Sequence, residues 1–117
     1  EDLDTKEDSA WLANKISSLR IFKDQDGMMN NSVMDVDGDI IVVSQFTLHA
    51  KTKKGTRPSY IKAAKPDYSI PLYNQFIDDL STAIDKEVQT GEFGANMQVS
   101  LTNDGPVTII IDTKSKE

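Results

Sequence analysis

The residues of this chain that could do chemistry are few, and their types restrict the reactions open to it. The 117 residues include no cysteine and a single histidine, His49. Without cysteine there is no thiolate nucleophile, no disulfide and little scope for a structural zinc site. No serine lies in a Gly-x-Ser-x-Gly motif, and His49 is the only imidazole. A serine–histidine–acid triad is therefore not expected.

Two short polar segments remain as candidates. Residues 44–48 read Ser-Gln-Phe-Thr-Leu, and residues 103–108 read Asn-Asp-Gly-Pro-Val-Thr. Taken alone, the first is typical of side chains that satisfy the main chain at a strand end, and the second is typical of a turn. Gly105 would let the backbone approach a ligand closely, and only before a proline such as Pro106 does a cis peptide cost as little as about 1 kcal/mol.

The other polar clusters are weaker candidates. Asp24 and Asp35 each begin an aspartate-rich and glycine-containing turn, but neither register supplies both the glycine and the glutamate of a calcium-binding EF-hand loop. We expect no metal site and no other cofactor. On an extended segment, His49 would point the same way as Thr47. It is either a contact in the same site or an ordinary polar side chain.

The elements that position these segments can be predicted from periodicity. Residues 5–8, Thr-Lys-Glu-Asp, form a capping box before a helix over residues 6–19, whose apolar stripe is Leu12, Ile16 and Leu19, with Trp11 beside it. A second helix is predicted over residues 70–86, with Ser69 as its N-cap. Its stripe consists of Tyr73, Phe76, Ile77, Leu80 and Ile84.

Several of the remaining segments are predicted to be strands. Residues 40–43 form a β-branched run typical of a strand buried on both faces, which places Ser44 at a strand end. Further strands are predicted at residues 87–92, 97–102 and 107–112. Aspartate–glycine turns are predicted at residues 24–27 and 35–39. The expected fold is α+β, with two helices packed on a mixed or antiparallel β-sheet sandwich or barrel.

Composition and charge indicate one soluble domain, residues 1–117, with a cytoplasmic location and no membrane partner. The net charge of −6 is unusual for a nucleic-acid-binding protein. However, the stretch between residues 40 and 66 has no acid and six basic residues, namely Lys51, Lys53, Lys54, Arg57, Lys62 and Lys65. We call residues 51–65 the basic loop. It follows the first polar segment directly, so a tRNA end could dock there, although a solvated loop of lysines is also possible.

Taken together, the two polar segments resemble the two signature motifs of the D-aminoacyl-tRNA deacylases. The resemblance covers almost the whole chain. It includes residues 20–22 (Arg-Ile-Phe), 55–59 (Gly-Thr-Arg-Pro-Ser), 62–64 (Lys-Ala-Ala) and 90–97 (Thr-Gly-Glu-Phe-Gly-Ala-Asn-Met). Proteins of that family begin with a β-hairpin that this sequence lacks, so we expect a chain truncated at its N-terminus. We also expect no signal peptide.

The resemblance implies hydrolysis of the ester bond of D-aminoacyl-tRNA, and of glycine mischarged on alanine tRNA, by a homodimer whose active sites lie at the interface. It implies a cis peptide at Gly105-Pro106 that enters the partner's site, where main-chain oxygens hold the amino group of the substrate. This turn excludes L side chains by collision, which is specificity by rejection.

Within the first motif, the resemblance implies that amides near Phe46 and Thr47 stabilise the oxyanion while Ser44 and Gln45 place the terminal ribose. Phe93 and Met97 would pack against the terminal adenine, although both also suit a core.

Two other functions are compatible with the residues. The chain could be a non-catalytic RNA-binding module that uses the basic loop, with both motifs serving as turns. It could instead be an esterase with Thr47 or Ser44 as a covalent nucleophile. We favour a positioning role for Thr47, because a threonine hydroxyl without a nearby base is a poor nucleophile.

Overall fold

The first helix, α1 (Lys6–Ser18), begins where the capping box predicts. In the computed structural model, which describes all residues from 1 to 117, the amide of Asp8 donates to the Thr5 hydroxyl at 3.3 Å. In return, the amide of Thr5 donates to the Asp8 carboxylate at 2.8 Å. Two main-chain donors that the helix itself cannot satisfy are thus paired.

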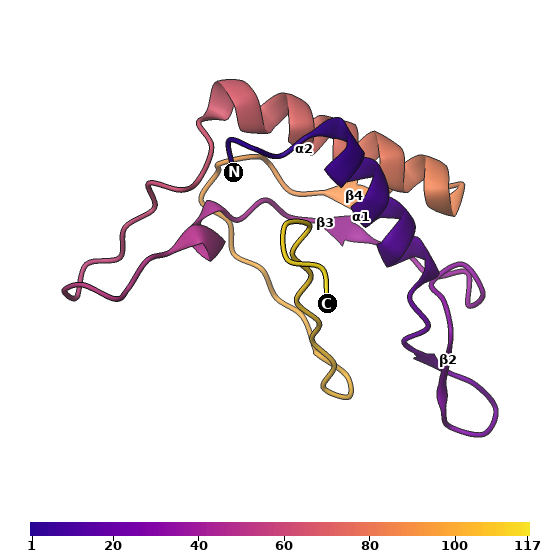
Figure 1. Ribbon diagram of the computed structural model, residues 1–117. Helices are drawn as coiled ribbons and strands as arrows, with labels where there is room; N and C mark the ends of the chain where they lie inside the picture. Colours follow the sequence, from indigo (N-terminus) through magenta and orange to yellow (C-terminus); the bar gives the residue numbers. More distant parts are fainter.

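The buried face of α1 differs from the prediction. Its fully buried residues are small, namely Ser9, Ala13 and Ser17, whereas Leu12, Ile16 and Leu19 are only half-buried. The reason is the neighbouring helix α2 (Pro66–Ile84), which lies along α1 (Figure 1). Small side chains allow the two backbones to approach closely, and the Ser9 hydroxyl donates to the Asp79 carboxylate at 2.7 Å.

Helix α2 starts four residues earlier than predicted. Lys65 is its N-cap and Pro66 its first residue, where a proline loses no helical hydrogen bond. Ser69 is therefore inside the helix, and its hydroxyl donates back to the Lys65 carbonyl at 3.1 Å. The helix ends at Asp85, whose φ of 54° is left-handed.

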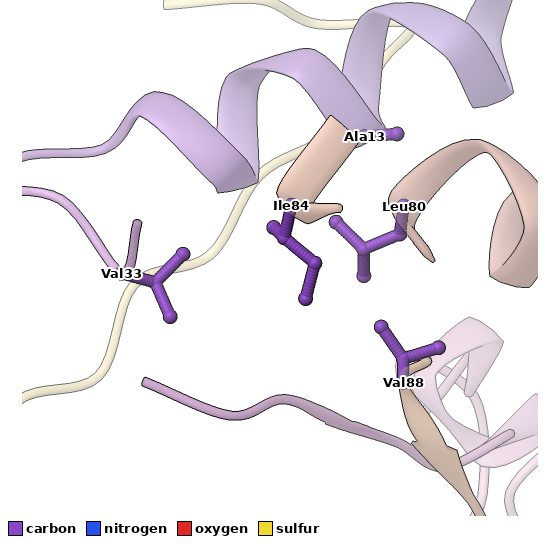
Figure 2. Close-up of a cluster of buried hydrophobic side chains, with 5 residues drawn as sticks. All are labelled: Ala13, Val33, Leu80, Ile84 and Val88. Carbon is purple, nitrogen blue, oxygen red and sulfur yellow. The ribbon is translucent and has the colours of Figure 1, made fainter. Parts of the chain in front are cut away.

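The hydrophobic core is small and is shared by both helices. It consists of Ala13, Val33, Leu80, Ile84 and Val88 (Figure 2). Phe76 and Ile77 of α2 pack against it, as the predicted stripe requires.

Two short sheets complete the fold. Strands β1 (Phe22–Lys23) and β2 (Met29–Asn31) pair antiparallel around the predicted turn at residues 24–27. Strands β3 (Ile41–Val42) and β4 (Gln89–Thr90) pair in parallel. The arrangement confirms an α+β fold with mixed strand pairing.

Strand β3 is not buried on both faces, contrary to the prediction. Ile40 and Val42 pack against the core, whereas Ile41 is 63% exposed. Successive strand residues point to opposite faces, and the core covers only one of them.

The two strands predicted near the C-terminus are also absent. Residues 97–102 and 107–112 pair with no strand and run beside each other as an arm below the helices (Figure 1). Their side chains include Leu101, 75% exposed, and Ile110, 93% exposed. The composition favours strands, but a strand also needs main-chain hydrogen bonds to a partner, and none joins these two segments to each other or to another strand. None of the helices has the length and apolar character needed to cross a membrane.

Candidate active-site cleft

A cleft of about 620 Å³ opens between the end of β3, the first half of α2 and the segment that follows β4. Its lining includes Ser44, Gln45 and Phe46 from the first motif, together with Phe93 and Met97 from the segment after β4. Five of the eight residues that the sequence singles out therefore lie around one cavity. Residues of α2, including Leu72 and Tyr73, also line the cleft.

The first motif turns sharply within the cleft. Phe46–His49 form a 3₁₀ turn, η1, and not the extended segment on which Thr47 and His49 would point the same way. The prediction about His49 was wrong in its geometry, because His49 lines the cleft whereas Thr47 does not. The Thr47 hydroxyl instead accepts a hydrogen bond of 2.5 Å from the side-chain amide of Gln45.

One lining residue of the cleft is an aromatic side chain that the sequence suggested only as part of the apolar stripe of the second helix. Tyr73 packs on Phe93 with ring centroids 5.3 Å apart, and its hydroxyl donates to the Val42 carbonyl at 3.1 Å. Burial raises the pKa of the Tyr73 hydroxyl. Tyr73 thus joins α2, the end of β3 and Phe93. Its place among helical apolar positions gave no signal of this role.

The segment after β4 approaches the first motif through its backbone. The Gly94 amide donates a long hydrogen bond of 3.5 Å to the Ser44 hydroxyl. A Cβ at Gly91 would lie 2.6 Å from the sulfur of Met97, so glycine lets Met97 fold over the chain here.

The second motif forms a fixed turn at the tip of the C-terminal arm. The Gly105-Pro106 peptide is cis, as the resemblance implies. The Asn103 side chain accepts from the Val107 amide at 3.0 Å and donates to the Thr108 hydroxyl at 3.1 Å, which closes the turn.

Gly105 is required in this turn. Its φ is 138°, and a Cβ there would lie 2.9 Å from a methyl carbon of Val107. Gly105 and Pro106 do not line the cleft of their own chain.

No group of three or more His, Cys, Asp or Glu residues is arranged to hold a metal ion.

Comparison with known proteins assigns the chain to a protein family. The family model described as D-Tyr-tRNA(Tyr) deacylase matches residues 1–112, almost the full length. The chain belongs to this deacylase family. The resemblance seen in the motifs is thereby confirmed.

Curated relatives of this deacylase-family chain support the assignment. Proteins named D-aminoacyl-tRNA deacylase from Bacteroides fragilis, Flavobacterium johnsoniae and Akkermansia muciniphila are 66%, 63% and 57% identical to it. Each alignment covers 100% of this chain and 78% of the relative.

A solved structure shares the fold of this deacylase-family chain. The c-Myc DNA Unwinding Element Binding Protein superposes with a TM-score of 0.82 at 38% sequence identity. The match covers 92% of this chain and 72% of that protein.

Proposed function

We propose that this chain is a single deacylase domain that hydrolyses the ester bond between a D-amino acid and tRNA, releasing the free amino acid and the tRNA. Glycine mischarged on alanine tRNA would be a second substrate. The observation that carries the proposal is the cleft: Ser44, Gln45, Phe46, Phe93 and Met97 all line one cavity, in a chain of the deacylase family.

In the proposed mechanism the terminal adenosine enters this cleft. Phe93 and Met97 pack against the adenine, while Ser44 and Gln45 place the ribose. The amides of Phe46 and Thr47 open η1, where main-chain donors have no partner within the turn, and they would stabilise the oxyanion that develops at the ester carbonyl. An aminoacyl ester is already reactive, so orientation and oxyanion stabilisation can supply the catalysis.

The geometry favours this mechanism over a covalent nucleophile. The Thr47 hydroxyl is outside the cleft lining and is engaged by the amide of Gln45, which is not a base. His49 makes no hydrogen bond to Ser44 or Thr47 that could activate either hydroxyl.

Discrimination between D and L substrates would come from a second copy of the chain. We propose a homodimer in which the Gly105-Pro106 turn of one copy enters the cleft of the other. The turn is closed by the Asn103 side chain and lies away from its own cleft, which suits a rigid element that acts in trans. Main-chain oxygens of the turn would hold the amino group of the substrate, so the turn is needed for activity as well as for selection. An L side chain would collide with this backbone, whereas a D side chain or the hydrogen of glycine would not.

Hydrolysis of D-Tyr-tRNA and L-Tyr-tRNA by the same protein preparation tests the activity. We expect release of tyrosine from the D ester only. Equal rates on both esters, or no hydrolysis of either, would refute the proposal.

Complementation tests the dimer. Gln45→Ala removes a cleft residue and Gly105→Ala disturbs the turn, so each variant alone should be nearly inactive. When the two are mixed and allowed to exchange subunits, half of the dimers are mixed and each has one intact site, so about a quarter of the original activity should return. No recovery despite mixed dimers would show that cleft and turn act within one chain.

A further inference from the structure

The basic loop leaves the body of the protein between η1 and α2 (Figure 1). Its base is held by two main-chain hydrogen bonds: the Lys51 amide donates to the Ser59 carbonyl at 2.8 Å, and the Ser59 amide donates to the Lys51 carbonyl at 3.0 Å. The residues between them are exposed, including Lys53, Lys54 and Arg57. None of these cations takes part in an ion pair, since all ion pairs of the chain involve the N-terminus, Lys86 or Lys114.

An aromatic pair connects this loop to the cleft. Phe46, which lines the cleft, packs edge-on against Tyr60, the residue after Ser59 at the base of the loop, with ring centroids 5.1 Å apart and an interplanar angle of 76°. Phe46 is 57% exposed, so the pair adds little to the core and presents an aromatic surface to solvent. The Tyr60 hydroxyl makes no hydrogen bond within the chain.

Cations and exposed aromatic rings together suit a single-stranded nucleic acid. Bases stack on aromatic rings, and phosphates pair with lysine and arginine. The remainder of this chain is strongly acidic and would repel phosphates, so the basic loop is the surface where they are tolerated.

We propose that the Phe46–Tyr60 pair and the basic loop bind the single-stranded nucleotides that precede the terminal adenosine of the tRNA. A base stacks on the aromatic pair, and Lys53, Lys54 and Arg57 pair with the phosphates. The inference rests on the proposed function, since it extends the same cleft to the next nucleotides of the same substrate.

Two ester substrates separate this inference from the proposed activity. D-Tyr-tRNA contains the preceding nucleotides, whereas 3′-O-(D-tyrosyl)adenosine does not. Lys53→Ala/Lys54→Ala should lower kcat/KM for D-Tyr-tRNA by about tenfold at low salt, with a much smaller change for the adenosine ester. The matched control is Lys6→Ala/Lys23→Ala, which removes the same charge from exposed positions outside the loop and should leave both rates unchanged.

Binding provides a readout that does not depend on catalysis. The probe is a fluorescently labelled, unacylated RNA hairpin with a single-stranded CCA end, and its affinity is measured by anisotropy at several salt concentrations. The Lys53/Lys54 variant should reduce the slope of log affinity against log salt by about 0.7 for each phosphate that the loop no longer neutralises. Tyr60→Ala should weaken binding about fivefold or more, while Tyr60→Phe, which keeps the ring, should bind normally.

The outcomes are distinct. Equal losses of activity in the Lys53/Lys54 variant and its control, or an unchanged salt slope, would overturn the inference. So would equal losses on the two esters. If the unaltered chain hydrolyses neither ester, the proposed activity fails, and the hairpin measurements still decide whether the loop binds RNA.

Discussion

Lys114 Nζ lies 2.6 Å from the Asp8 carboxylate, so the C-terminal tail is held against the first turn of α1. The same ammonium donates to the Leu3 carbonyl at 2.9 Å, and Lys116 lies over the ring of Trp11 at 4.4 Å from its centroid. The arm that carries Gly105 and Pro106 has no strand pairing with the rest of the chain. These tail interactions therefore fix the end of the arm.

The ion pair between Lys114 and Asp8 should make stability depend on acid pH. The hydrogen bond from Lys114, followed by that from the Thr5 amide, lowers the pKa of Asp8 to about 2. A lowered pKa means that the stabilisation is complete above the unfolded-state value near 4 and is lost as the pH falls toward 2. Asp8→Asn should thus unfold at lower urea than the original chain at pH 7, and the two midpoints should converge near pH 2. Glu7→Gln, in the same helical turn but without an ion pair, is the control. A difference that persists at pH 2 would contradict the expectation.

The role of Thr47 can be decided by substitution. In the proposed mechanism its hydroxyl only holds Gln45, through the 2.5 Å hydrogen bond. Thr47→Ala should therefore lower kcat/KM for D-Tyr-tRNA by about tenfold to a hundredfold through misplacement of Gln45, and Thr47→Ser should retain most activity. Complete loss of activity in Thr47→Ala, together with a trapped acyl-enzyme in the original chain, would instead identify Thr47 as a nucleophile.

Deacylase activity should be far more sensitive to substitution of Gly105 than to substitution of other glycines with a positive φ. Gly105→Ala places a methyl group 2.9 Å from Val107, which forces the turn to shift. Since an error of about 1 Å in a site can cost about a hundredfold in rate, we expect a loss of that order in the deacylation assay. Gly27→Ala is the matched control, because Gly27 also has a positive φ but has nothing within 4 Å of its added Cβ. Equal activities of the two variants would rule out a catalytic role for the turn.

The small core makes Leu80 the most consequential position for stability. Leu80 is 1% exposed and lies in the core cluster between both helices. Leu80→Ala should reduce the free energy of unfolding by about 2–5 kcal/mol, measured by urea denaturation. Leu3→Ala, at a side chain that is 76% exposed, should change it little. Similar losses of stability in the two variants would mean that the cluster is not the main source of stability.

Local features of this protein could be predicted from the sequence. Thr5 and Asp8 are three residues apart and satisfy each other's amides in any context that starts a helix, so the capping box and α1 appear as expected. The turn at residues 24–27 follows in the same way from aspartate and glycine preferences. The two motifs also indicated the deacylase family, because that inference depends on residue types and order alone.

The tertiary structure decided what depends on distant neighbours. Ser9 and Ala13, not Leu12, face α2 because the separation of two helices selects small residues where they meet. Residues 97–102 and 107–112 form no strands because no main-chain hydrogen bonds join them to each other or to another strand, and propensity alone does not supply such pairing. His49 enters the cleft and Thr47 does not, because η1 turns the chain there. Periodicity describes a residue's own segment, whereas burial, pairing and the lining of a cleft are set by whatever packs against that segment.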